Sequence, residues 1–126
     1  MPTTINHITV DSHDPSAQAR RWCEVFGVAM DPEDFPGDPA AVVHQPAGPS
    51  VFFEQVPEGR SVTNRVHLDL TPETTRDEEV VRLHGLGASQ VADHRRPDGT
   101  GWVTMTDPEG NEFCVERSAA ERAASA

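Results

Sequence analysis

Two histidines, one glutamate and one cysteine stand at matched positions in the two halves of this 126-residue sequence. His7 and His67 are separated by 67 − 7 = 60 residues, and Glu54 and Cys114 by 114 − 54 = 60 residues. Imidazole, carboxylate and thiolate groups are all ligands of divalent metal ions. If the halves are copies of one unit, a pseudo-two-fold arrangement would bring the four side chains together. They would form either a metal site or the polar lining of a cavity that holds no metal.

The same offset relates other features of the chain, which indicates an internal repeat. Phe26-Gly27-Val28 matches Leu86-Gly87-Ala88, so each half has a glycine where a helix would end. The sequence therefore predicts two modules over about residues 5–56 and 65–116, joined by residues 57–64. Together they are expected to form one domain over residues 1–126.

Each half must supply strands and a helix to position these side chains. Asn64–Thr71 alternates apolar and polar residues, as a strand with one buried face does, and Ile5–Val10 repeats the pattern. A helix is predicted from the N-cap Asp14 to Gly27, and its counterpart from the N-cap Thr74. Further strands are predicted near Val28–Met30, Ala40–Gln45, Val51–Val56, Gln90–Asp93, Trp102–Thr106 and Asn111–Glu116.

These elements predict an α+β fold of two tandem βαβββ modules. Their strands would form a curved mixed sheet, a half-barrel cleft with both helices outside. In the last strand of each module, Phe53 and Phe113 would face the helix, so that Glu54 and Cys114 would face the cleft. Cys23 falls on the helix side, and we therefore expect two free thiols.

The composition excludes several classes of partner. The net charge is −11, whereas nucleic acids and anionic membranes require a basic surface. No apolar run approaches the ~20 residues of a membrane-spanning helix, and the first residues are not typical of a signal peptide. Two cysteines fit a reducing compartment. We expect a cytoplasmic protein with no nucleic-acid or membrane partner.

Four stretches of the chain resemble the vicinal oxygen chelate superfamily, in particular its small glyoxalase-like group. They are H-I-T-V-D-S-H-D-P at 7–15, R-W-C-E-V-F-G at 21–27, N-R-V-H-L-D-L at 64–70 and D-P-E-G-N-E-F-C-V at 107–115. The superfamily includes glyoxalase I, extradiol dioxygenases and bleomycin-resistance-type binding proteins. Its fold is built from paired βαβββ modules, which agrees with the repeat.

The resemblance implies a divalent metal ion (zinc, nickel, iron or manganese) held by His7, Glu54, His67 and Cys114. In glyoxalase I the carboxylate ligands also move protons, and Cys114 stands where a glutamate would be expected. The resemblance thus assigns Glu54 a catalytic role, with Glu116 as a neighbouring acid that could share it. A thiolate ligand favours zinc or another thiophilic ion. The resemblance also implies a homodimer.

Two functions are compatible with these residues. One is a metal-dependent enzyme of lyase, isomerase or dioxygenase type, acting on a small carbonyl, enediol or catechol-like substrate. The other is a metal-free protein that binds or sequesters a small molecule, as bleomycin-resistance proteins do. Asp69 would lie at the rim of the cleft and orient the ligands. His44 and His94 are equally compatible with plain surface positions and with positions near the site.

Overall fold

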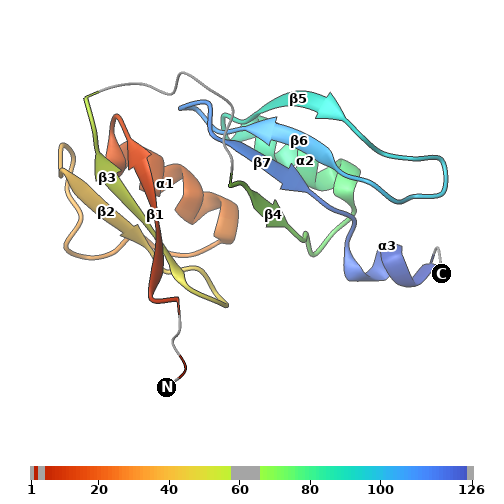
Figure 1. Cartoon of the computed structure of the whole chain (residues 1–126), viewed down its shortest axis with the longest axis horizontal. Helices are drawn as coiled ribbons and strands as arrows, with labels where there is room; N and C mark the ends of the chain where they lie inside the picture. The colour runs from red at the N-terminus through yellow and green to blue at the C-terminus, as the bar shows by residue number, and fades with distance from the viewer. Residues whose placement is uncertain (1, 3–4, 58–65, 125–126) are drawn as a thin grey trace. The chain divides into compact units, whose positions relative to one another are not determined.

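The computed structural model of the protein describes residue 2, residues 5–57 and residues 66–124. The chain divides into two compact units, Met1–Gly59 and Arg60–Ala126, and each is described by itself. Among the described residues, no helix is long and apolar enough to cross a membrane. Helices and mixed sheets in both units confirm the α+β fold (Figure 1).

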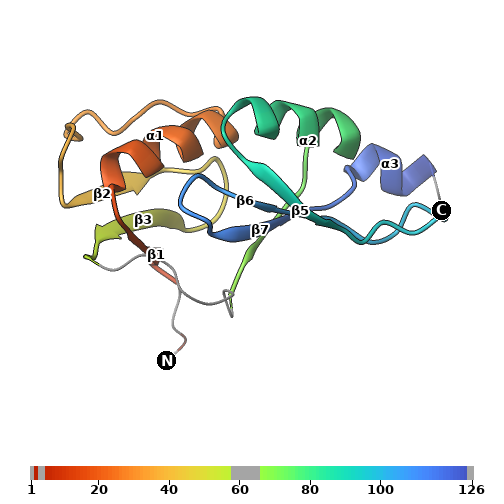
Figure 2. The ribbon, with the colours of Figure 1, turned by 90° about the horizontal axis from the view of Figure 1, so that it is seen from above.

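Unit 1 is one helix packed on a three-stranded mixed sheet (Figure 2). The strand order is β1-β3-β2, with β1 parallel and β2 antiparallel to the central β3. The elements are β1 (His7–Ser12), α1 (Pro15–Phe26), β2 (Ala40–Val43) and β3 (Ser50–Gln55).

Helix α1 begins and ends where the sequence indicates. The Asp14 carboxylate caps it by accepting a hydrogen bond from the Ala17 N–H at 3.3 Å, and Pro15 occupies the first turn, where no N–H is needed. Gly27 closes the helix with a φ of 69°, a left-handed conformation that glycine adopts without steric cost. Trp22 and Cys23 face the sheet and are almost fully buried.

The core of unit 1 lies between α1 and one face of the sheet. Val51 and Phe53 of β3 are buried there, whereas Phe52 is half-buried and Glu54 is exposed on the opposite face. Glu54 therefore points away from the helix, as the alternation of the sequence predicts.

The strand predicted near Val28–Met30 is wrong, because the structure has no strand there. The Val28 N–H donates to the Cys23 carbonyl at the end of α1, so it is not free to pair with a strand. Pro32 and Pro36 then break any extended pairing in the segment that leads to β2. The described part of unit 1 is therefore β-α-β-β rather than β-α-β-β-β.

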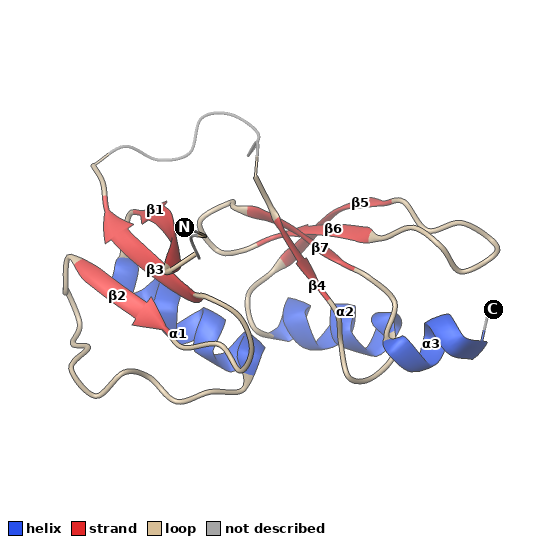
Figure 3. Cartoon of the chain, turned by 60° about the horizontal axis from the view of Figure 1, so that its bottom comes forward, coloured by secondary structure: helices blue, strands red, loops and turns tan. Residues whose placement is uncertain are grey.

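Unit 2 has the full β-α-β-β-β order, followed by a short third helix (Figure 3). Its strands lie in the order β4-β7-β6-β5, with β4 parallel to β7 and the other pairs antiparallel. The elements are β4 (Leu68–Leu70), α2 (Arg76–Gly85), β5 (Ser89–Asp93), β6 (Val103–Thr106), β7 (Glu112–Val115) and α3 (Ala119–Ala124). The predicted strand Asn64–Thr71 partly falls on residues 64 and 65, outside the described residues.

Helix α2 begins one residue later than the sequence suggests, because Thr75 and not Thr74 is the N-cap. The Thr75 hydroxyl accepts a hydrogen bond from the Glu78 N–H at 3.2 Å and donates one to the Glu78 carboxylate at 2.8 Å. Leu83 is fully buried on the inner face of α2, and Arg76 is also buried. The Arg76 guanidinium reaches back to the Gly99 and Gly101 carbonyls at 2.9 and 2.7 Å.

Candidate metal centre

Strands β4 and β7 of unit 2 bring three possible metal ligands together. His67 immediately precedes β4, and Asp69 lies two residues further on, so both side chains share one face of the strand. Parallel pairing places Cys114 of β7 directly opposite Asp69. Thr104 of β6 is the partner of Cys114 on its other side.

The ligand atoms of His67, Asp69 and Cys114 all lie within 4.8 Å of one another. The Nδ1 atom of His67 is 3.8 Å from the Cys114 sulfur and 3.4 Å from a carboxylate oxygen of Asp69. Ligand atoms of a tetrahedral zinc ion, at the usual bond lengths, are roughly 3.4–3.6 Å apart. The three side chains therefore fit a divalent ion without a large rearrangement.

The electrostatics of this cluster favour a cation. Burial is the main cause that raises the pKa of the Cys114 thiol above 9.0, and the negative charges of Asp69 and Glu116 raise it further. The Thr104 hydroxyl, 3.7 Å from the sulfur, opposes the shift. Two carboxylates near a buried thiol create a negative potential, which a divalent ion would neutralise while stabilising the thiolate.

In unit 1, His7 and Glu54 are not neighbours. The parallel register pairs His7 with Ser50 and Asp11 with Glu54, so Glu54 lies four positions along β3 from the partner of His7. The side chain beside His7 is Phe52, whose ring centroid is 5.3 Å from that of the imidazole.

This difference arises from the register of the two parallel pairs. In unit 1, paired residues differ by 53 − 10 = 43 positions (Val10 with Phe53), and in unit 2 by 115 − 70 = 45 (Leu70 with Val115). The 60-residue repeat of the sequence therefore conceals a shift of two residues, about 7 Å along a strand. Phe52 occupies in unit 1 the place that Cys114 occupies beside His67.

The other residues singled out from the sequence are also located. Glu116 follows β7, where its N–H donates to the Leu70 carbonyl at 2.9 Å and its carboxylate lies 3.8 Å from the Arg122 guanidinium. The two cysteines carry free thiols, one in each unit. Cys114 is only 5% exposed, so little of its thiol is open to solvent. The meeting of His7 and Glu54 with the unit 2 cluster stays a prediction.

Asp69 is the member of this cluster that the sequence analysis placed at the rim of the cleft. The signal for it was present, since His67 and Asp69 stand two residues apart in an alternating strand. The 60-residue comparison could not show it, because the matching position in the first half is Thr9.

A family model described as the glyoxalase-like domain matches residues 7–116. The chain belongs to the glyoxalase-like domain family. No curated protein shows significant similarity to the chain. The family match confirms the resemblance carried by the four sequence stretches.

Solved structures with the same fold include proteins of several activities. A glyoxalase/bleomycin resistance protein/dioxygenase family enzyme from Burkholderia phytofirmans PsJN is 15% identical, with a TM-score of 0.68, over 90% of this chain and 97% of that chain. The oxidase ChaP-H1 is 25% identical, with a TM-score of 0.64, over 90% and 94% of the two chains.

A third structure contains a metal ion. It is a mutant of the fosfomycin resistance protein FosX from Listeria monocytogenes, in complex with Mn(II) and a dihydroxypropylphosphonic acid. That protein is 16% identical, with a TM-score of 0.69, over 97% of this chain and 95% of that chain. This glyoxalase-like fold thus occurs in oxidases, resistance proteins and glyoxalase-related enzymes, and one of these structures is a complex with Mn(II).

Proposed function

We propose that this glyoxalase-like protein is a divalent-metal-dependent enzyme of lyase, isomerase or dioxygenase type. Its substrate would be a small carbonyl, enediol or catechol-like molecule. The observation that carries the proposal is the convergence of the His67, Asp69 and Cys114 ligand atoms within 4.8 Å. The Mn(II) ion of the FosX complex is an independent reason to consider metal chemistry on this fold.

The geometry of the imidazole favours a metal site over a cysteine nucleophile. In a Cys-His-Asp relay, the thiol and the carboxylate contact opposite nitrogens of the ring. Here Cys114 and Asp69 both approach Nδ1 of His67. Such an arrangement gathers three ligand atoms on one side of the imidazole ring, and the raised thiol pKa disfavours a free thiolate nucleophile.

In this proposal, different residues of the chain bind the metal ion and move protons. When bound, a divalent ion supplies Lewis acidity that polarises substrate oxygens. His67, Asp69 and Cys114 would hold it, and the thiol would lose its proton on loading. Glu116 is the nearby acid that would move a substrate proton. Its ion pair with Arg122 would compete with that role. His7 keeps its predicted role as a metal ligand, and Glu54 keeps its predicted roles as a metal ligand and a proton-moving base. The thiolate favours zinc among the candidate ions.

Metal binding by the purified chain tests this function. We expect one zinc ion per chain by calorimetry, and an ion at 100 times its Kd would stabilise the fold by about 2.7 kcal/mol. His67→Ala and Asp69→Asn should weaken binding strongly, whereas His94→Ala should not change it. No saturable binding of zinc, nickel, iron(II) or manganese would reject the metal-dependent function.

One observation favours the metal-free alternative. Because Phe52 lies beside His7 where a second ligand pair would be expected, unit 1 presents a phenyl and an imidazole ring to a ligand. Such a surface suits the stacking of an aromatic compound. The alternative function is therefore a small-molecule binding or resistance protein, which would retain its ligand after treatment with a chelator.

The proposal includes a cytoplasmic homodimer. Members of this fold bind small molecules, and pairing between chains would cover exposed strand edges such as β5. The net charge of −11 supports the expectation that neither nucleic acid nor an anionic membrane is a partner.

A further inference from the structure

In unit 1, hydrogen bonds link Asp31 to His44 and His44 to Ser50. None of these three residues is among those proposed to hold metal. Ser50 is the first residue of β3, and His44 directly follows β2. Since β2 and β3 are antiparallel with Val43 opposite Val51, the next position places His44 beside Ser50. Asp31 comes from the segment between α1 and β2.

The contacts use opposite sides of the imidazole ring. The Nε2 atom of His44 is 2.9 Å from Oδ2 of Asp31, and the Ser50 hydroxyl is 3.4 Å from Nδ1. This differs from His67, where both neighbours approach the same nitrogen. Contacts between a nucleophile and its base are often loose before substrate binds.

Asp31 is fixed in place and stays ionised. Its other oxygen, Oδ1, accepts a hydrogen bond from the Glu33 N–H at 2.9 Å. This bond is the main cause that lowers the pKa of Asp31, and the bond with His44 adds to it. Because a carboxylate accepts hydrogen bonds only, the proton of neutral His44 lies on Nε2 and the lone pair on Nδ1 faces Ser50.

We propose that Ser50 is a nucleophile, with His44 as its general base and Asp31 as the positioning residue, and that this site acts on small esters with good leaving groups. The Ser50 oxygen attacks the ester carbonyl while its proton passes to His44 Nδ1. The bond to the leaving alkoxide or phenoxide then breaks, and that group takes the proton from His44. Water, deprotonated by His44, next attacks the acyl carbon. The bond from that carbon to the Ser50 oxygen breaks, His44 returns the proton to this oxygen, and the carboxylic acid is released.

The exposure of the three groups suits this role. The side chain of His44 is 60% exposed and Ser50 is half-buried, so a substrate reaches the base and the hydroxyl from solvent, whereas the side chain of Asp31 is only 23% exposed. A small ester or an organophosphorus reagent can therefore approach Ser50 without any opening of the core.

Covalent labelling of the whole chain tests the proposal. A fluorophosphonate forms an oxygen–phosphorus bond to an activated serine and releases fluoride, while the base takes the serine proton. We expect one adduct per chain, mapped to Ser50 by peptide mass spectrometry. Ser50→Ala should abolish it, and the exposed matched control Ser89→Ala should label at the wild-type rate. The reaction is run with a chelator present, so its outcome is independent of the metal site.

Substitutions of His44 and Asp31 test the relay itself. His44→Gln should slow labelling by about 100-fold, the usual contribution of a general base. Asp31→Asn keeps the shape and the bond from Glu33, but its amide would favour the wrong tautomer of His44 and should slow labelling with an unchanged unfolding midpoint. No adduct, an adduct on another residue, or full-rate labelling of Asp31→Asn would each overturn the proposal.

Discussion

Cys114 lies against both His67 and Thr104 and is almost fully buried. At the scale of single residues, Cys114 is the position where this chain departs from the glyoxalase-type ligand set. The change from a carboxylate to a thiol has a clear chemical consequence. A thiolate is a soft ligand, whereas the glutamate expected at this position is hard. The identity of this one side chain therefore bears on which metal the proposed site would select.

The first prediction concerns that selectivity. Cys114→Glu should shift preference from zinc toward harder ions such as manganese, because an oxygen donor replaces sulfur beside His67. Competition calorimetry with zinc and manganese measures the ratio of affinities. An unchanged ratio would mean that Cys114 is not a ligand.

The second prediction concerns the titration of the same thiol in metal-free protein. Burial favours the neutral form and raises the pKa of Cys114, so the thiolate fraction at neutral pH is smaller than for an ordinary cysteine. Alkylation by iodoacetamide should therefore rise with a midpoint above pH 9.0. The free energy that this thiol contributes to folding is present below that pH and decreases as the pH rises through the raised pKa. Mass spectrometry of the alkylated protein measures this midpoint. A midpoint below pH 9.0 would contradict the buried environment of Cys114.

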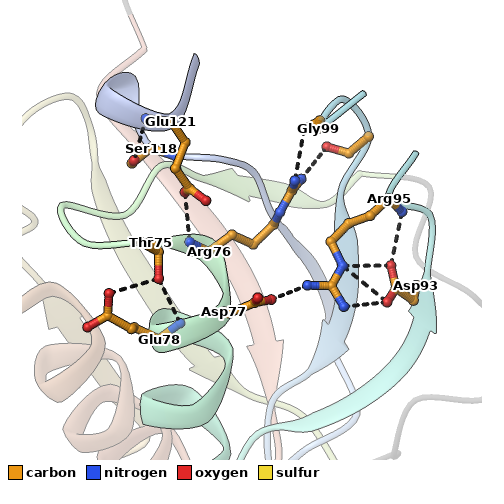
Figure 4. Close-up of polar contacts among 10 residues, drawn as sticks. Thr75, Arg76, Asp77, Glu78, Asp93, Arg95, Gly99, Ser118 and Glu121 are labelled. Carbon is orange, nitrogen blue, oxygen red and sulfur yellow. Dashed lines mark hydrogen bonds and ion pairs between the residues drawn. The ribbon is translucent and has the colours of Figure 1, made fainter. Parts of the chain in front are cut away.

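At the scale of elements, one carboxylate links the starts of two helices (Figure 4). Oε1 of Glu121 in α3 accepts hydrogen bonds from the Arg76 N–H at the start of α2 and from the Ser118 N–H before α3, at 2.8 and 2.9 Å. The Ser118 hydroxyl in turn accepts one from the Glu121 N–H at 3.1 Å, which completes a capping box. Glu121 therefore holds α3 at the start of α2 within unit 2.

The third prediction follows from this shared cap. Glu121→Ala should lower the free energy of unfolding by about 1 kcal/mol or more, since both helix starts lose an acceptor. Although burial opposes it, bonds from Ser118 and Arg76 lower the Glu121 pKa below 4.5, so the contribution is present above that pH and lost below it. Urea denaturation at pH 7 measures the change, with the exposed Glu73→Ala as control. Equal stability of the two variants would reject the shared cap.

The elements also show how far the sequence alone could reach. Asp14, Pro15 and Gly27 are local signals, and they correctly predicted where α1 begins and ends. The strand register is set by packing between distant segments, so a fixed 60-residue offset could not reveal that unit 1 differs by two positions. For the same reason, the proximity of His7 to Phe52 and of Asp31 to His44 could not be predicted from the sequence.

At the scale of the whole molecule, two units of related topology carry different chemistry. Unit 2 holds the His67, Asp69 and Cys114 cluster, and unit 1 presents an aromatic pair at the corresponding place. The register difference predicts unequal contributions to metal binding. We expect His67→Ala to weaken it more than Glu54→Gln.

The fourth prediction is that the chain forms a homodimer in solution. Pairing of two copies would cover exposed strand edges, which otherwise favour unspecific association. Light scattering across micromolar concentrations should give about twice the 13.7 kDa mass of the chain. The monomer mass at every concentration would reject it.

The most direct test of the account is spectroscopic titration of metal-free protein with cobalt(II), a substitute for zinc. We predict a sulfur-to-cobalt charge-transfer band that saturates at one equivalent, because Cys114 must bind the ion as a thiolate beside His67 and Asp69. The band should vanish in Cys114→Ser and persist in Cys23→Ser and His94→Ala. Saturable cobalt binding without this band, or with a band that survives in Cys114→Ser, would contradict the metal centre proposed for unit 2.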